Sequence, residues 1–285
     1  MQYRQIEEAV FLARPNRFVA EVERPDGSRL RAHVKNTGRC AELLVPGARV
    51  YLEGADNPRR ATPCDLVAVE KRVPGGARLI NMDSAAPNLA AGEWLASGGL
   101  GPLEALRAEQ RAGDSRLDFA ARQQGRPVYI EVKGCTLEQD GLALFPDAPT
   151  LRGLKHLRTL TALAGQGARC CVLVVIQMQG VRAFAPNWAT QPEFGRALQQ
   201  AAAAGVEIHA MDCAVTPRQP DPARPRPRPP GPAGVRESAP AATIRSDKTQ
   251  KGSLPRHNRR AAEPPQRVEK LDTLHKRQQP RTAIA

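Results

Sequence analysis

The longest apolar run of the chain, residues 170–176, constrains its fold most. A run of this length is too short to cross a membrane, which takes about 18 residues, but it suits a strand that is buried on both faces of a sheet. A helical pattern at 150–164, which begins with a Thr150 cap, precedes the run, and another at 191–204 ends at Gly205. Strands and helices that alternate in this way predict an α/β domain.

Shorter patterns complete this α/β domain, which we place at residues 84–216. Helices are expected at 88–96 and 102–112, and strands at 116–121, 128–135 and 206–211. The turn Gln-Gln-Gly-Arg separates the first two of these strands, so we expect them to form an antiparallel hairpin.

Residues 1–83 have a different pattern, in which apolar and polar side chains alternate with the period of strands. The alternation covers 18–23, 29–34, 48–52 and 66–71, and turns that contain Pro and Gly separate these segments. Four or five short strands at this spacing favour a small barrel, either OB-like or SH3-like. The predicted fold class is therefore a two-domain protein, with an N-terminal β-barrel followed by the α/β domain.

Residues 217–285 lack any core-forming pattern. They contain no Phe, Tyr or Trp and hold 13 of the 26 prolines, several of them in the run Arg-Pro-Arg-Pro-Arg-Pro-Pro. Such a segment cannot bury enough apolar area to offset its ordering entropy, so we expect a disordered basic tail. It either adds sequence-independent attraction to nucleic acid or is a solvated tail with no specific role.

The strong positive charge of the chain comes mostly from this tail. The chain has 42 Lys+Arg and 29 Asp+Glu, a net charge of +13, but residues 218–285 hold 16 of the bases and only 6 of the acids. The folded part is therefore nearly neutral, which excludes a uniformly basic protein. The N-terminus carries acids where a signal peptide needs a basic start and an apolar stretch, so we expect a cytoplasmic protein without a membrane segment.

The six cysteines are scattered, and none forms a C-x-x-C pair. Without that spacing, and in a reducing compartment, we expect them to be buried small apolar residues rather than disulfide partners or zinc ligands. They are Cys40, Cys64, Cys135, Cys170, Cys171 and Cys213.

Two carboxylates and a lysine on adjacent strands form the candidate catalytic site. Glu131 and Lys133 are two residues apart and therefore share a face of their strand. If the hairpin is centred on Gln124-Gly125, the register places Asp118 opposite Glu131, with Cβ atoms about 4.5–5.5 Å apart. Because facing carboxylates repel each other, a divalent cation such as Mg²⁺ between them would remove the cost.

Asp118, Glu131 and Lys133 are the smallest set of side chains that metal-assisted hydrolysis of a phosphodiester requires. Lys133 would orient a water or neutralise charge that develops on the phosphate. An acid and a lysine two residues apart also occur on any solvated strand face, which is the alternative interpretation of the spacing.

Polar residues on the following helix extend the pattern. Arg152, Lys155, His156 and Thr159 fall on one helix face, which suits a phosphate backbone unless it is an ordinary exposed face. Asp147 lies near the start of the same helix, where it is either a further site residue or a cap-region acid. We therefore expect this helix to border the site.

The barrel carries a second basic segment, residues 29–39, with four cations and no acid. Lys35, Asn36 and Arg39 belong to it, and the Asn-Thr-Gly sequence predicts a loop. Cations and a loop on a small barrel suit contact with a single strand or with a nucleic-acid backbone. A basic hairpin without a ligand is the alternative.

Several motifs together resemble the sugar fermentation stimulation protein A family. The matching stretches are Asn16-Arg17-Phe18, Asn36-Thr37-Gly38-Arg39 with Glu42-Leu43-Leu44, Pro46-Gly47, Ser115-Arg116-Leu117-Asp118-Phe119, Glu131-Val132-Lys133, Phe145-Pro146-Asp147-Ala148-Pro149-Thr150, Arg152-Gly153, Lys155-His156-Leu157 and Pro186-Asn187. The resemblance covers residues 1–215, so the tail lies outside it. It implies an OB-like barrel followed by a domain similar to PD-(D/E)XK nucleases.

The resemblance also implies a bacterial DNA-binding protein that is linked to the regulation of sugar metabolism. It makes Asp118 and Glu131 metal ligands and Lys133 the active-site lysine. Weaker correspondences add Glu109, on the expected preceding helix, as a further acid ligand, and Gln177 as a polar residue that faces the site. The expected nucleic-acid contacts are Arg17, Lys35, Asn36, Arg39, Arg116, Arg152, Lys155 and His156.

We therefore expect a DNA-binding protein with a metal-dependent nuclease site that uses Mg²⁺ or Mn²⁺. The alternative is a non-catalytic DNA-binding regulator of sugar (maltose) metabolism, which uses the same face only to grip DNA. RNA is a third candidate, which an OB-like barrel permits. The oligomeric state stays open.

Overall fold

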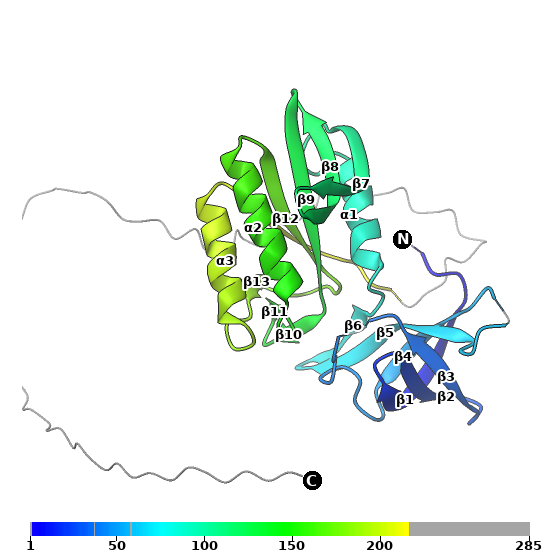
Figure 1. Ribbon diagram of the computed structural model, residues 1–285. Helices are drawn as coiled ribbons and strands as arrows, with labels where there is room; N and C mark the ends of the chain where they lie inside the picture. The colour runs from blue at the N-terminus through cyan, green and yellow to red at the C-terminus, as the bar shows by residue number, and fades with distance from the viewer. Residues whose placement is uncertain (1, 37, 58, 217–285) are drawn as a thin grey trace, which may run out of the picture. The chain divides into compact units, whose positions relative to one another are not determined.

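The computed structural model describes residues 2–36, 38–57 and 59–216. Within them the chain forms a β-barrel and then an α/β unit built on a five-stranded sheet (Figure 1). Among these residues, no helix combines the length and the apolar character that crossing a membrane requires. The expected disordered tail, 217–285, lies outside the described residues.

The barrel is built from the six strands of one sheet. They are β1 (Ile6–Asn16), β2 (Val19–Glu23), β3 (Arg29–Val34), β4 (Arg49–Gly54), β5 (Cys64–Val73) and β6 (Gly76–Asn81). The strands pair in the order β3-β2-β1-β4-β5-β6, and β3 also pairs with β5. The β3–β5 pairing closes the first five strands on themselves, which gives the OB-like rather than the SH3-like barrel.

Alternation places small apolar side chains inside this barrel. Ala20 and Val22 of β2, and Ala32 and Val34 of β3, are fully buried. The turn between the two strands contains Gly27 with a φ of +83°, which a residue without a Cβ adopts without strain. These predicted strands are confirmed, whereas β1 and β6 are absent from the prediction because few of their side chains are buried.

The α/β unit follows the barrel. Its helices are α1 (Ala86–Ala96), α2 (Leu151–Gly165) and α3 (Pro192–Ala203). Its main sheet has the order β14-β12-β9-β8-β7 and contains β7 (Glu104–Ala112), β8 (Ser115–Gln123), β9 (Arg126–Cys135), β12 (Arg169–Ile176) and β14 (Glu207–Asp212). A small sheet joins β10 (Leu137–Gln139), β11 (Leu142–Phe145) and β13 (Ala183–Pro186). Strands β9, β12 and β14 are parallel, and helices connect them.

Strand β12 is buried on both faces, as its apolar run predicts. Each of residues 170–176 is at most 1% exposed. Val172 and Val174 pack with the layer that contains α2 and α3, whereas Cys171 and Leu173 pack with α1 on the other side of the sheet (Figure 1). The predicted α/β layering is therefore confirmed.

The helix predicted at 102–112 is wrong, because this segment is the edge strand β7. Its residues, such as Glu104 and Ala108, have high or moderate helix propensity, yet the segment pairs with β8 from one end to the other. Gly113, with a φ of +57°, makes the tight turn between the two strands. Pairing with a neighbouring strand thus overrides local propensity.

The hairpin of β8 and β9 has the predicted register. Phe119 pairs with Ile130, and the ladder centres the turn on Gln124-Gly125. Both turn residues have a positive φ, +50° and +76°, as a type I′ turn requires. The same register, continued by one residue, places Asp118 opposite Glu131.

The cysteines are free thiols, and five of the six are buried. Burial raises the pKa of Cys40 and of Cys135 to about 12, so these thiols stay protonated at neutral pH. Cys213 is only partly buried. The expectation of buried small residues is confirmed for the other five.

Ion pairs and hydrogen bonds join the barrel to the α/β unit. Lys71 of β5 donates to the Glu138 carboxylate of β10, with an Nζ–Oε2 distance of 2.8 Å. At the end of β6, the N–H of Asn81 donates to the carbonyl of Gln177 at 2.8 Å. The connection therefore combines an ion pair with a main-chain hydrogen bond between the two sheets.

The ion pair of Arg169 and Glu207 predicts a pH-dependent contribution to stability. The Arg169 guanidinium bonds both carboxylate oxygens of Glu207, at 2.6 and 2.8 Å, and lowers the pKa of Glu207 to about 2. A carboxyl with a depressed folded-state pKa stabilises the fold above its ordinary pKa of 4.5, and this contribution is lost as the pH falls toward about 2. We expect Glu207→Gln to have a lower Tm than wild type at neutral pH, and the difference to shrink below pH 4.5.

Thermal unfolding followed by circular dichroism at several pH values measures this difference. Glu193→Gln, which removes an exposed helix pair with Arg196, is the control and should show little effect at any pH. A Tm difference for Glu207→Gln that is independent of pH would contradict the assignment.

Candidate active site

Asp118 lies where the ladder between β8 and β9 ends. The main-chain pairing ends at Phe119 and Ile130, and beyond it the Oδ2 atom of Asp118 accepts the N–H of Val132 at 2.7 Å. Asn88, in α1, donates its side-chain amide to Oδ1 at 3.0 Å. Both carboxylate oxygens are thus held in place, and each keeps a lone pair for a further ligand.

The strands bend at this point. Leu117 packs with the α2 layer and Phe119 with the α1 layer, although residues two apart share a face in a regular strand. On β7, Glu109 occupies the register position opposite Asp118 and has a φ of +53°. A left-handed conformation is costly for a residue with a Cβ, and such strain is concentrated at functional sites. The bend turns the Asp118 side chain toward the neighbouring strand.

Glu131 is the buried member of the site, with a side chain that is 2% exposed. Its Oε1 atom contacts Nζ of Lys133 on the same strand and Nδ1 of His156 on α2. A buried carboxylate needs such partners, because an unpaired charge is costly to remove from water. The shared face predicted for Glu131 and Lys133 is confirmed, whereas the role of His156 in holding Glu131 was not predicted from the sequence.

The other carboxylate oxygen of Glu131, Oε2, is buried and has no hydrogen-bond partner among the described residues. Nearly all buried polar atoms in proteins are satisfied, so this oxygen calls for an explanation. Together with the oxygens of Asp118 it offers hard donors, the type that Mg²⁺, Mn²⁺ and Ca²⁺ prefer.

No group of three His, Cys, Asp or Glu side chains within residues 2–36, 38–57 and 59–216 is arranged to hold a metal ion. A cation at Asp118 and Glu131 would therefore need waters or a substrate oxygen to complete its shell. Mg²⁺ is commonly bound in this way, through one or two carboxylates. The residues present thus fit a divalent cation whose remaining positions stay open.

Glu109 does not join this donor set. It lies on the edge strand β7 rather than on a helix, and its side chain is 66% exposed. Its carboxylate lies 3.6 Å from the Arg116 guanidinium, which is also exposed. The predicted helix position of Glu109 is therefore wrong, because the residue lies on a strand. Its carboxylate forms a surface pair with Arg116, one of the predicted nucleic-acid contacts, and its role as a metal ligand stays a prediction.

The polar face expected on α2 divides into an exposed part and a buried part. Arg152 and Lys155 are exposed, and Lys155 donates to a main-chain carbonyl of the β7–β8 turn at 2.7 Å. His156 is only 4% exposed, and the hydroxyl of Thr159 lies 2.7 Å from that of a serine on β8. The prediction that His156 contacts nucleic acid is wrong, because the helix turns it toward the buried carboxylate.

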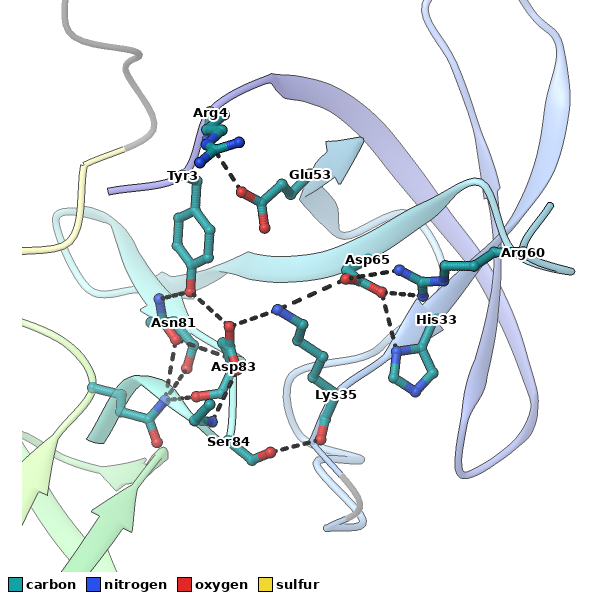
Figure 2. A network of polar contacts seen from close by, with 12 residues as sticks. Tyr3, Arg4, His33, Lys35, Glu53, Arg60, Asp65, Asn81, Asp83 and Ser84 are labelled. Atoms are coloured by element: carbon teal, nitrogen blue, oxygen red, sulfur yellow. Dashed lines mark hydrogen bonds and ion pairs between the residues drawn. The ribbon is translucent and has the colours of Figure 1, made fainter. Parts of the chain in front are cut away.

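Lys35 belongs to an internal polar network rather than to a free basic surface (Figure 2). Its Nζ lies 2.9 Å from Oδ2 of Asp83 and 3.7 Å from Oδ2 of Asp65. Asp83 is 2% exposed, and Arg60 and His33 both contact Asp65. Burial alone would lower the pKa of Lys35, but the nearby carboxylates outweigh it and raise the pKa. The charge of Lys35 is thus already paired within the protein, and its contact with nucleic acid stays a prediction.

The same network ties the barrel to the start of α1, the helix that carries Asn88. Oδ1 of Asp83 accepts the N–H of Ala85 at 2.9 Å, directly before the helix. Ser84 donates its hydroxyl to the carbonyl of Lys35 at 2.9 Å (Figure 2). The segment that enters α1 is therefore fixed against the residue that follows β3 of the barrel.

Gln177 is a second link between the two parts. Its side-chain amide donates to both oxygens of Asn81 and to the carbonyl of Asp83, at 3.0–3.1 Å. A Cβ on Gly134 would lie 2.7 Å from Oε1 of Gln177, so this oxygen packs against the residue that follows Lys133. Gln177 therefore lies beside the site and is engaged in the link, and none of its hydrogen bonds involves Asp118, Glu131 or Lys133.

Arg14 organises the barrel loop that contains Asn36, Gly38 and Arg39, a role that the sequence pattern did not indicate. Its guanidinium donates to the main-chain carbonyls of Arg17, Asn36, Gly38 and Arg39 at 2.6–2.9 Å. Oδ1 of Asn36 accepts the N–H of Gly38 at 2.9 Å. Arg14 thus joins this loop to the β1–β2 turn, and the side chains of Arg39 on the loop and Arg17 in the turn are both exposed.

Asp147 lies against the same loop. A Cβ on Gly38 would meet Oδ2 of Asp147 at 2.6 Å, which shows how closely the loop approaches the segment before α2. Asp147 is exposed, and Thr150 rather than Asp147 caps the helix, through the N–H of Gly153 at 2.9 Å. The structure therefore confirms the predicted cap and places Asp147 at the barrel loop.

A cavity of about 730 Å³ lies apart from the carboxylate–lysine set. Tyr3, Trp94 and Met211 contribute to its wall, and its acidic lining residues are Glu93 and Asp212. Acidic side chains repel a phosphate group, whereas the set on β8 and β9 combines carboxylates with a lysine. We therefore assign the candidate chemistry to that set and not to the cavity.

Comparison with protein families finds two matching models. Residues 12–82 match the SfsA N-terminal OB domain, and residues 85–219 match the sugar fermentation stimulation protein RE domain. The barrel is therefore an OB domain, and the α/β unit is the RE domain of this family.

Individual proteins give the same result. A sugar fermentation stimulation protein homolog of Desulfitobacterium hafniense strain Y51 is 50% identical over 216 residues, which cover 76% of this chain and 92% of that protein. A homolog of Ruminiclostridium cellulolyticum is 45% identical over 216 residues, which cover 75% and 93%. The solved structure of Pyrococcus furiosus SfsA in complex with Ca²⁺ has a TM-score of 0.66 and 28% identity, and covers 74% of this chain and 90% of that one.

The close packing at Gly134 predicts that a single added methyl group lowers the stability of the fold. A Cβ there would meet Cγ of Pro87 at 2.6 Å and Oε1 of Gln177 at 2.7 Å. Because a proline ring is rigid, we expect Gly134→Ala to lower the free energy of unfolding by about 1–3 kcal/mol, the usual cost of overpacking. Gly165→Ala is the control, since its Cβ has no neighbour within 4 Å. Urea unfolding measures both variants, and equal midpoints would contradict the packing described beside Lys133.

Proposed function

We propose that this chain, which belongs to the sugar fermentation stimulation protein A family, binds DNA and cleaves a phosphodiester bond with the help of a divalent cation. The observation that carries the proposal is the set of Asp118, Glu131 and Lys133 on one hairpin. Binding alone does not call for two carboxylates beside a phosphate, because like charges repel. Hydrolysis does call for them, as anchors for a cation.

Asp118 and Glu131 would hold the cation. The support on the side of Glu131 is the buried, unpartnered Oε2 atom, and on the side of Asp118 the lone pairs that its two hydrogen bonds leave free. A bound cation supplies positive charge that polarises a phosphoryl oxygen and makes water more acidic. The Ca²⁺ complex of the Pyrococcus furiosus relative supports a divalent cation, and we propose Mg²⁺ or Mn²⁺ for this chain.

Lys133 and His156 share the task of positioning Glu131. Both contact Oε1, so they fix the carboxylate and leave Oε2 for the cation. His156 is almost fully buried and stays behind the carboxylate, whereas the Lys133 side chain is 13% exposed. Lys133 is therefore the member that can turn toward a scissile phosphate and stabilise the charge that develops there.

Exposed cations on both parts of the chain would hold the DNA backbone. Arg17 lies in the turn between β1 and β2, Arg39 lies on the barrel loop, and Arg152 and Lys155 lie on the exposed side of α2. Such contacts neutralise phosphates without reading bases, so we propose weak sequence specificity. RNA would satisfy the same contacts, and it is compared directly in the experiment below.

A non-catalytic DNA-binding regulator of sugar metabolism is the second candidate. One observation favours it: within the described part of the chain, no third acid or histidine completes a metal cluster with Asp118 and Glu131. Lys133 and His156 would then serve only to neutralise a buried charge.

The decisive experiment incubates the full chain with single- and double-stranded DNA and RNA, with Mg²⁺, with Mn²⁺ and with a chelator. Cleavage that depends on the cation would support the enzymatic proposal, and the preferred strand would identify the substrate. Binding without cleavage in every metal would contradict it and favour the regulator.

Lys133→Ala should separate chemistry from affinity. If Lys133 stabilises charge that develops only in the transition state, its loss should lower kcat by roughly 10²–10³-fold, with little change in Kd. Arg39→Ala should do the reverse, weakening binding while kcat at saturating DNA stays nearly unchanged. Single-turnover cleavage and fluorescence anisotropy measure the two quantities. Equal losses of affinity in both variants, without an effect on kcat, would argue for the regulator.

Variants of the carboxylates should weaken binding of the cation itself. Asp118→Asn and Glu131→Gln each remove a negative oxygen donor, so calorimetric titration with Mn²⁺ should show little or no binding. His156→Gln removes the group that holds Oε1, and we expect a loss of affinity of about 10–100-fold, typical of residues that orient a ligand. His209→Gln is the control, because His209 also contacts a glutamate but lies on β14. Unchanged Mn²⁺ titrations in both carboxylate variants would rule out this site.

A further inference from the structure

An exposed aromatic side chain lies beside a cation in the turn between β1 and β2. Phe18, in the turn between β1 and β2, is 42% exposed, and the guanidinium carbon of Arg17 lies 4.8 Å from the centre of its ring. The main chain of Phe18 is anchored on both sides: its N–H donates to Oδ1 of Asn16 at 2.9 Å, and its carbonyl accepts the N–H of Val34 at 2.8 Å. The ring is therefore presented to solvent from a well-fixed backbone.

The cations around Phe18 keep their charge uncompensated. Within the described residues, no carboxylate forms an ion pair with Arg14, Arg17 or Arg39. Arg14 donates to neutral main-chain carbonyls, which shape the loop without cancelling its charge. By contrast, the two arginines of β3 pair with glutamates of β2. Asp147 approaches the barrel loop, but it does so beside Gly38 and forms no ion pair with these three arginines among the described residues. This end of the barrel therefore combines an exposed ring with unpaired positive charge.

We propose that Phe18, Arg17 and Arg39 form a subsite for one unpaired base of a single strand and the phosphates beside it. The inference rests on the proposed binding of nucleic acid and names the form of nucleic acid that the barrel selects. Every base has a face that can stack on an aromatic ring, but in a duplex that face is covered by the neighbouring base pairs. The loop between the first two strands is also one of those through which OB barrels bind oligonucleotides.

The Arg17 guanidinium already occupies the position that a base would take. A stacked base would replace it over the Phe18 ring, and the released guanidinium would then pair with an adjacent phosphate. Arg39 would pair with a second phosphate. The contacts of Arg14 already hold the loop in place, so binding would not have to order it.

The test compares Phe18→Ala with wild type on two probes, a short single-stranded DNA and a blunt hairpin duplex, in the presence of a chelator so that nothing is cleaved. We expect Phe18→Ala to lose about 5- to 150-fold in affinity for the single strand, the range found when a stacking side chain is removed. Its affinity for the duplex should change little. A third probe, a single strand that lacks bases, should bind wild type and Phe18→Ala equally.

Two further variants separate stacking from structure and from charge. Phe18→Trp keeps a stacking surface and should retain the wild-type affinity for the single strand. Val45→Ala removes another exposed apolar side chain of the barrel, 47% exposed, and should change neither affinity. Arg17→Ala and Arg39→Ala should each reduce the salt dependence of single-strand binding by about 0.7 in slope, whereas Phe18→Ala should leave that slope unchanged.

The outcomes distinguish this inference from the proposed function. Wild-type protein that binds the duplex but not the single strand would overturn the subsite and leave DNA binding standing. Wild-type protein that binds no probe would overturn both. Equal losses of Phe18→Ala on single strand and duplex, or on strands with and without bases, would show that Phe18 supports the loop rather than a base.

Discussion

The burial of the Glu131 carboxylate is the constraint on which the α/β unit depends. A carboxylate that is 2% exposed needs polar partners in place of the water it has lost, and Lys133 and His156 supply them from β9 and α2. Removing one partner of a buried pair typically costs about 3–5 kcal/mol. The docking of α2 on the sheet and the position of the candidate catalytic acid therefore rest on the same contacts, and loss of either residue would disturb both.

The barrel and the α/β unit share their polar framework as well. Lys35, which directly precedes Asn36 of the barrel loop, is held by Asp83, which in turn accepts the N–H of Ala85 at the start of α1 (Figure 2). That helix carries Asn88, which fixes Asp118. The barrel loop thus begins next to Lys35, and α1 begins next to Asp83, the ion-pair partner of Lys35. One ion pair therefore connects the loop that carries Arg39 with the helix that orients Asp118.

Features that depend on local pattern could be predicted from the sequence, and features that depend on tertiary contacts could not. The apolar run of β12, the Thr150 cap and the register of the β8–β9 hairpin follow from periodicity and turn length. Strand β7 could not be predicted, because its residues favour a helix and only the pairing with β8 makes it a strand. In the same way, helical spacing placed His156 beside exposed cations, but the spacing does not say how far the buried side of α2 extends around the helix.

The side chain of Asp118 provides the hydrogen bond to β9 that continues the β8–β9 ladder beyond its last main-chain pair. The N–H of Val132 is bonded to the carboxylate and not to the main chain of β8. Any change in the charge of that carboxylate therefore alters the hydrogen bond of one particular backbone amide. The amide proton of Val132 is therefore a spectroscopic probe of the charge of Asp118. This probe needs no label, no substrate and no turnover assay.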